Sequence, residues 1–275
     1  MSTETQGIKG VILGPPGIGK TSLLHSLDPA RTLALDLEAG MLSVRGWQGT
    51  VQPVRSWPEA RALAAVIGGI DPASEPDKPY GAKYYEQAIK SFPLDMVKYS
   101  TVFIDSITVA SRLCLKWVKQ QPEAFDKQGQ FSNLKAYGLL GQEMMSWLVH
   151  LQHTQGKNIW FVGILEKESG DLGEVGWNIQ MEGSKAGKEL PGIVDQVITM
   201  QEITTKKDDV QTKRRAFICQ GLNRWNYPAK DRSGVLAMVE PAHLGKLMEK
   251  ILTNSKSVMS PNFDVSDFLA DEIIY

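Results

Sequence analysis

One stretch near the amino terminus constrains the fold of this chain more than any other feature. Residues Gly14 to Thr21 read GPPGIGKT and match the pattern G-x-x-x-x-G-K-[ST]. An apolar run from Ile8 to Leu13 precedes the motif, and leucines at helical spacing follow it, which predicts a strand, a loop and a helix. Such a loop turns successive backbone N–H groups toward a phosphate chain, at the positive end of the helix dipole. The residues expected to contact a nucleotide are Gly14, Pro15, Pro16, Gly17, Ile18, Gly19, Lys20, Thr21 and Ser22.

The motif also predicts the partners of a metal-bound nucleotide. Lys20 is expected to reach the β- and γ-phosphates, and the Thr21 hydroxyl to hold Mg²⁺. The second ligand of the metal should be a carboxylate at the end of another buried strand. Asp105 holds this position, directly after Thr101-Val-Phe-Ile. Asp105 could equally cap the helix that follows it, and both roles are compatible.

Glu38 follows a second apolar strand, Thr32 to Leu37. Carboxyl ends of parallel strands face the ligand crevice, so Glu38 could orient or deprotonate an attacking water. Spacing alone gives equal weight to a solvated loop residue.

The remaining pattern predicts an α/β fold, a mainly parallel central sheet with helices on both faces. Further strands are expected at Asn158–Leu165, Ile193–Met200, Arg215–Gln220 and Val235–Val239. Helices are expected at Pro58–Ile67, from Ile107 to Val118, at Leu134–His153 and from Pro241 onward. Glycine and proline predict a loop at Gly68–Lys83, glycine and charge predict one at Gly170–Gly192, and Tyr84–Val97 has no clear pattern.

Composition excludes several classes of protein. Lys plus Arg (30) and Asp plus Glu (31) give a net charge of −1, so any attraction to nucleic acid must be local. Two cysteines, Cys114 and Cys219, cannot form a disulfide framework and predict buried thiols in a reducing cytoplasm. A polar start and the lack of a long apolar run predict neither a secretory signal nor a membrane partner.

The three motif segments together resemble the RecA-like P-loop ATPases. The matching pieces are Gly14–Thr21, Thr32–Gly40 and Thr101–Ser106. This resemblance covers about residues 8–252 and implies a RecA-like core that binds ATP and Mg²⁺ as cofactors. It also implies that Glu38 is the catalytic base, with Lys20 and Asp105 in catalytic roles.

Within that family the chain is most similar to short phage proteins of single-strand annealing and recombination. Leu190-Pro191-Gly192 resembles a late loop of that group, and Tyr227–Gly234 resembles its Lys-x-Arg-x-Gly element. The resemblance implies a homo-oligomer with the nucleotide at the subunit interface. Lys230 and Arg232 would then reach the nucleotide of a neighbouring subunit, whereas a solvated basic turn is an equal alternative.

The chain departs from this family at the strand after the long helix. RecA-like proteins carry a polar sensor there, but this strand ends Val162-Gly-Ile-Leu165. Either Glu166 or Lys167 takes that role, or γ-phosphate sensing is altered.

Two regions are candidates for binding single-stranded DNA. In RecA-like filaments, the DNA lies along the loop after the helix that follows the Asp-bearing strand and along the loop after the sensor strand. Residues Arg112 to Tyr137 contain five cations, two acids and four aromatic rings, of which Trp117 and Tyr137 are expected in the helix core. Glu166 to Leu190 contains six acids and three lysines, a poor electrostatic match. The candidate residues are Lys116, Lys119, Phe125, Lys127, Phe131, Lys135, Lys185 and Lys188. A third basic patch, Lys206 to Arg232, could face DNA or a neighbouring subunit.

The chain divides into a core, 1–252, and an acidic tail, 253–275. The tail could dock on a protein partner or fold back on the core. His150 and His153 lie three residues apart, but without a third ligand they are interpreted as surface or packed histidines. The sequence thus predicts an ATPase that engages single-stranded DNA in phage-type recombination or annealing. The alternatives are a motor or loader ATPase acting on a helicase or packaging partner, and a nucleotide-gated binding module without significant hydrolysis.

Overall fold

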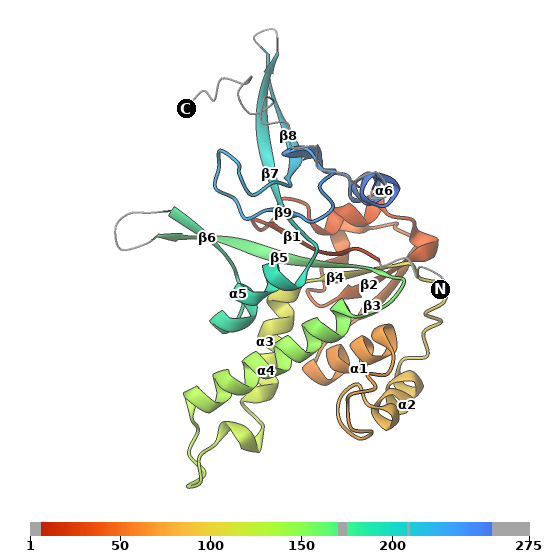
Figure 1. Cartoon of the computed structure of the whole chain (residues 1–275), viewed down its shortest axis with the longest axis vertical. Helices are drawn as coiled ribbons and strands as arrows, with labels where there is room; N and C mark the ends of the chain where they lie inside the picture. The colour runs from red at the N-terminus through yellow and green to blue at the C-terminus, as the bar shows by residue number, and fades with distance from the viewer. Residues whose placement is uncertain (1–6, 170–174, 208–209, 255–275) are drawn as a thin grey trace.

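A ten-stranded sheet forms the centre of the molecule (Figure 1). The computed structural model describes residues 7–169, 175–207 and 210–254. The main path of strands runs β10-β8-β7-β1-β5-β4-β2-β3, and β1 pairs in parallel with both β5 and β7. The parallel strands are β1 (Lys9–Gly14), β2 (Thr32–Asp36), β3 (Thr50–Pro53), β4 (Thr101–Asp105), β5 (Asn158–Ser169) and β7 (Gln196–Lys207). The antiparallel additions are β6 (Val175–Ile179), β8 (Val210–Ile218), β9 (Lys230–Asp231) and β10 (Val239–Pro241).

Helices cover both faces of this sheet. Successive residues of a strand point to opposite faces, so apolar side chains on each face need a helix layer to bury them. Val11 and Leu13 of β1 belong to one buried cluster, and Ile12 between them belongs to the other. The first cluster is completed by α1 (Trp57–Gly68), α3 (Ile107–Val118) and α4 (Asn133–Gln152), with α2 (Ala82–Ser91) beside α1. The second is completed by α6 (Leu244–Asn254) and the short 3-10 helix η1 (Thr21–Ser26). The predicted fold class, a mainly parallel α/β sheet with helices on both faces, is therefore confirmed.

Three parallel strands bring the candidate site residues to one edge of the sheet. Strands β1, β2 and β4 are buried along their whole length, as expected for the interior of a parallel sheet. They end at Gly14, Asp36 and Asp105, and Asp36 and Asp105 are register partners. The loop after β2 stays close to β4 because the Leu37 N–H donates to the Asp105 carbonyl at 2.7 Å.

Several predicted elements differ from the structure. The helix after the phosphate loop is only the six-residue η1, since Pro29 opens another 3-10 turn, η2 (Pro29–Arg31), soon after it. The predicted loop Gly170–Gly192 contains β6 and the helix α5 (Ser184–Ile193), which forms despite glycine and Pro191 within it. The strand predicted at Val235–Val239 begins only at Val239, and Tyr84–Val97 includes most of α2. Short 3-10 turns η3 (Met41–Val44) and η4 (Pro122–Ala124) complete the described elements.

The buried thiols predicted from the sequence are confirmed, because Cys114 and Cys219 are both buried and free. Among the described residues, no helix combines the length and apolar character needed to cross a bilayer.

Candidate functional site

The phosphate loop is held open by its glycines and anchored by Ile18. Gly17 and Gly19 adopt positive φ angles of 76° and 98°, which side chains rarely tolerate. A Cβ on Gly14 would lie 2.7 Å from the Met200 carbonyl oxygen of β7, so the start of the loop has no room for a side chain. Ile18 packs into the second core cluster, whereas Pro16 and Gly17 are exposed. Pro15, Lys20, Thr21 and Ser22 are half-buried, so the predicted contact residues line one accessible loop.

Lys20 lies across this loop. Its Nζ donates to the carbonyl oxygens of Gly14 and Pro15, both at 2.9 Å. Burial lowers the pKa of the Lys20 ammonium, and the carboxylates of Asp105 and Glu38 oppose that shift. The side chain therefore sits between the loop and two acidic groups.

Thr21 and Asp105 meet directly. The Thr21 hydroxyl donates to Asp105 Oδ2 at 2.5 Å, and Asp105 is only 2% exposed. Burial is the main cause that raises the pKa of Asp105 to about 6; the nearby charges of Glu38 and Asp36 act in the same direction, and the Thr21 hydrogen bond and Lys20 oppose the rise. Ser106, and not Asp105, is the N-cap of α3, because the Ser106 hydroxyl accepts from the Val109 N–H at 3.3 Å. The alternative capping role considered for Asp105 is therefore wrong, and its carboxylate is directed to the phosphate loop.

Glu38 reaches the same place from the loop after β2. The Ser106 hydroxyl donates to Glu38 Oε1, and Asp36 Oδ1 accepts from the Gly40 N–H at 3.2 Å to shape the turn. A Cβ on Gly40 would lie 3.8 Å from the Glu38 Cβ and 4.0 Å from the Thr21 hydroxyl oxygen. Glu38 itself is exposed, so its carboxylate is accessible to water.

Lys230 and Arg232 lie elsewhere in the fold. β9 pairs with Gln196 and Val197, level with the beginning of β1, whereas the phosphate loop follows the end of β1. Lys230 Nζ donates to the carbonyl oxygens of Pro191 and Val194, at 2.7 and 2.9 Å. Arg232 forms an ion pair with Asp195 at 2.7 Å. These cations are not brought to the nucleotide loop of their own chain, so their role in a neighbouring subunit stays a prediction.

The candidate sensor residues Glu166 and Lys167 lie in an antiparallel hairpin of β5 and β6. β5 extends past Leu165, and Glu166 and Lys167 pair with Asn178 and Trp177 of β6. The Gln180 side chain donates to Glu166 Oε2 at 3.0 Å.

The DNA candidates fall into two groups. Lys116 and Lys119 are exposed on α3, together with Arg112. Phe125 is half-buried against the core and meets the exposed Phe131 edge-on, with ring centroids 5.8 Å apart. Lys135 Nζ donates to the Phe125 carbonyl oxygen, and Lys127, Lys185 and Lys188 are exposed. Trp117 packs against the core as expected, but Tyr137 is 45% exposed and was wrongly predicted as core.

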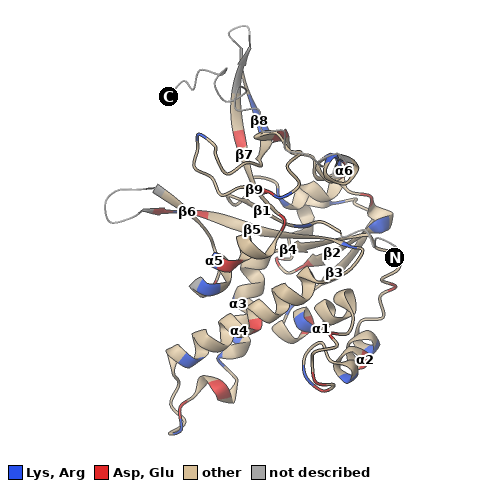
Figure 2. Cartoon of the chain, viewed as in Figure 1, with Lys and Arg blue, Asp and Glu red and all other residues tan. Residues whose placement is uncertain are grey.

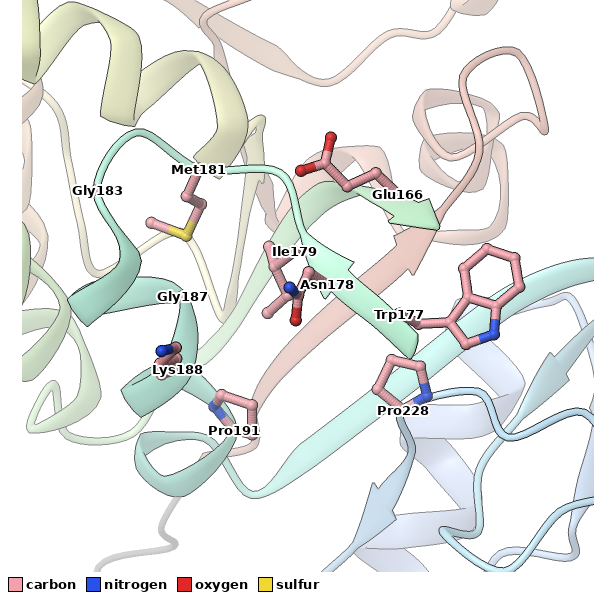
Figure 3. Close-up of a pocket in the computed structure, with 10 residues that line it drawn as sticks. All are labelled: Glu166, Trp177, Asn178, Ile179, Met181, Gly183, Gly187, Lys188, Pro191 and Pro228. Carbon is pink, nitrogen blue, oxygen red and sulfur yellow. The ribbon is translucent and has the colours of Figure 1, made fainter. Parts of the chain in front are cut away.

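A pocket missed in the sequence lies between the hairpin and α5. It holds about 450 Å³ and includes Trp177, Lys188 and Pro228 in its lining (Figure 3). Trp177 lies 4.9 Å from the Tyr227 ring, centroid to centroid. The alternation of Val175, Trp177 and Ile179 was the available signal for this strand.

The remaining predictions concern His150 and the tail. His150 stacks on Tyr80 with ring centroids 4.0 Å apart, as expected for a packed histidine. Within the described residues no group of three or more metal-ligating side chains is found. The tail lies almost wholly outside those residues.

A glycine-rich loop after the first strand, a lysine and threonine within it, and an aspartate at the end of β4 define a RecA-like P-loop nucleotide-binding protein. Comparison with protein families agrees with this class. A model described as an AAA domain matches residues 6–233, and the chain belongs to that family.

Two of the solved structures that match this chain are distant from it. One is a prototypical ATPase from the type III secretion system of pathogenic bacteria, 15% identical, with a TM-score of 0.38 over 71% of this chain and 51% of that one. The chain thus spans about half the length of that ATPase. The other is a KaiC-like protein from the hyperthermophilic archaeon Pyrococcus horikoshii OT3, 13% identical, with a TM-score of 0.35 over 78% of this chain and 79% of that one. Comparison with curated proteins finds no match to this sequence.

Proposed function

We propose that this chain is a Mg²⁺-dependent ATPase that engages single-stranded DNA. The observation that carries the ATPase proposal is the convergence of Lys20, Thr21, Asp105 and Glu38 from three separate loops at one edge of the sheet. A phosphate cradle, an oxygen-donor pair and an accessible carboxylate are the parts that phosphoryl transfer to water requires.

The donor pair fits Mg²⁺. The Thr21 hydroxyl oxygen and the Asp105 carboxylate are 2.5 Å apart, and hard oxygen donors of this kind suit a small divalent cation. These two residues would hold the ion, which neutralises charge developing on the β- and γ-phosphate oxygens when it is bound.

Hydrolysis then follows from the positions of Lys20 and Glu38. Lys20 binds the γ-phosphate, and Glu38 accepts a hydrogen bond from the attacking water. The water oxygen forms a bond to the γ-phosphorus, its proton passes to the Glu38 carboxylate, and the bond to the β-phosphate oxygen breaks, which yields ADP and phosphate.

Replacing Lys20 with alanine tests the nucleotide site. A lost hydrogen bond to a charged group costs about 1.5–3 kcal/mol, so ATP affinity should fall about 10- to 100-fold. Titration of a fluorescent ATP analogue measures this, and phosphate release should be lost at ATP concentrations that saturate the wild type. Lys246→Ala, an exposed lysine of α6, is the control. Equal affinity in the Lys20 variant would contradict the site, and wild-type binding without phosphate release would favour a nucleotide-gated binding module.

The DNA proposal is supported by a track of cations and aromatic surface. Arg112, Lys116 and Lys119 line a groove of about 380 Å³ on α3. The Arg112 guanidinium donates to the Gln180 side chain at 3.0 Å, and the segment around Gln180 leads to the pocket of Trp177 and Lys188. Cations can follow phosphates along this track, and an aromatic ring can stack on a base for about 1–3 kcal/mol.

Salt-dependent binding of labelled oligothymidine tests this track. The double change Lys116→Gln and Lys119→Gln should weaken binding and reduce the slope of log K against log salt by about 1.4, because each phosphate contact on a single strand contributes about 0.7. Fluorescence anisotropy measures both quantities. The matched control is Lys78→Gln with Lys90→Gln, which changes two exposed lysines, one in the loop before α2 and one in α2. An unchanged salt slope in the double variant would defeat the DNA proposal. Absence of DNA binding by the wild type, together with an ATPase rate that does not depend on DNA, would defeat it as well. An ATPase rate stimulated by a protein partner instead of DNA would favour a motor or loader ATPase.

We also propose a homo-oligomer with ATP at the subunit interface. Lys230 and Arg232 lie level with the opposite end of β1 from their own phosphate loop, which supports a role at the nucleotide of a neighbouring copy.

A further inference from the structure

One arginine outside the motif lies against the phosphate loop. Arg215 is an exposed residue of β8, opposite Glu202 of β7 in the antiparallel register. A Cβ built on Gly19 would lie 2.4 Å from Arg215 Nη1, 3.0 Å from its Cζ and 3.7 Å from its Nε. The guanidinium thus occupies the space that a side chain at position 19, next to Lys20, would fill.

This guanidinium has no hydrogen-bond or ion-pair partner among the residues that the structure describes. Across residues 7–169, 175–207 and 210–254, Arg215 forms neither an ion pair nor a side-chain hydrogen bond. By contrast, Arg61 pairs with Glu143, and Arg232 pairs with Asp195. A guanidinium is permanently charged and presents five donors in a fork that matches phosphate oxygens.

The negative charge at the site is not balanced by Lys20 alone, so a second cation would be favourable. A triphosphate with one Mg²⁺ carries a charge of about −2, and Lys20 is the single cationic side chain of the motif. Asp105 and Glu38 add negative charge close to Lys20. A second positive side chain at the loop therefore lowers the electrostatic cost of binding the phosphates.

We propose that Arg215 is a phosphate-binding residue of the nucleotide site in its own chain. Its guanidinium contacts phosphate oxygens of the bound nucleotide beside Gly19. This inference rests on the proposed nucleotide function and adds a residue that approaches from β8, on the far side of β7 from the loop. Figure 2 shows Lys and Arg on β8, and Arg215 is a residue of this strand that lies against the loop.

Displacement of a fluorescent ADP analogue by ATP and by inorganic tripolyphosphate tests the proposal. Arg215→Ala should weaken both competitors at least tenfold, because the contact is to phosphate and not to the nucleoside. Arg215→Lys, which keeps the charge but loses the fork, should recover part of the loss. Arg214→Ala is the matched control, since Arg214 is also exposed but points to the other face of the strand.

The outcomes separate this inference from the proposed function. Wild-type binding with equal affinity in Arg215→Ala would overturn the role of Arg215 and leave the nucleotide site standing. A loss for ATP but not for tripolyphosphate would overturn it as well, because the contact would then be to the nucleoside. Absence of ATP binding by the wild type would overturn the nucleotide function itself. Unchanged thermal unfolding of Arg215→Ala, expected for an exposed side chain, excludes misfolding as the cause.

Discussion

Glu38→Gln is expected to lower the rate of ATP hydrolysis about 10²- to 10⁴-fold while ATP affinity stays within a few fold of wild type. Glutamine keeps the size of the side chain and can still accept the hydrogen bond from the Ser106 hydroxyl. It cannot accept a proton at neutral pH, so only the transfer from the attacking water is lost. Phosphate release at saturating ATP measures the rate, and titration with a fluorescent ATP analogue measures the affinity.

Glu38→Gln should change the rate of ATP hydrolysis but not the affinity for ATP. Lys20 and Thr21 hold the phosphates and remain intact, whereas Glu38 is exposed and reaches the site only through its carboxylate. Glu249→Gln, which removes an exposed carboxylate on α6, is the control for the change of charge. Normal turnover by Glu38→Gln would remove this residue from the mechanism, and a parallel loss of affinity would make it a binding group instead.

The sequence predicts the site well where strand ends determine it. Gly14, Glu38 and Asp105 each follow an apolar strand, and parallel pairing brings such ends to one edge. The motif fixes local geometry, so the positive φ of Gly17 and Gly19 is also implied by residue type.

Contacts between distant segments carry no comparable signal. Arg215 reaches Gly19 because β8 pairs antiparallel to β7, which itself lies beside β1, and no local pattern encodes that neighbour relation. Likewise, the sequence predicts a loop where β6 lies, because glycine and flanking charges outweigh a short alternation, and pairing with the extended β5 decides the structure of this segment. Tyr137 fits a helical pattern, yet its place on α4 leaves it exposed.

Asp105→Asn is expected to stabilise the nucleotide-free protein at pH 7 by about 3 kcal/mol. The pKa of Asp105 rises from 3.8 to about 6 on folding because the carboxylate is buried, and each unit corresponds to about 1.4 kcal/mol. The folded state therefore binds more protons than the unfolded state between pH 4 and 6, so wild-type stability falls as pH rises through this range. Asparagine carries no charge and still accepts the Thr21 hydrogen bond, which makes its contribution independent of pH.

Urea unfolding of both proteins at pH 4, 5, 6 and 7 measures this difference. The two free energies of unfolding should nearly coincide at pH 4 and separate up to pH 6, with only a small further change at pH 7. Asp77→Asn, which neutralises an exposed carboxylate, should show little difference at any of these values. A difference that does not change with pH would mean that Asp105 is not the titrating group.

The same substitution should reverse its effect when MgATP is present. Any ligand that binds only the folded state stabilises it by an amount that grows with the logarithm of ligand concentration over Kd, and a cation beside Asp105 removes the cost of the buried charge. Wild type should therefore gain thermal stability with MgATP, whereas Asp105→Asn should gain little, because it lacks one of the two oxygen ligands. An equal gain in both proteins would show that Asp105 does not hold the ion. Asp105 would then destabilise the nucleotide-free protein and be required for the stabilisation by MgATP. This combination is expected of a residue that is retained for metal binding and not for folding.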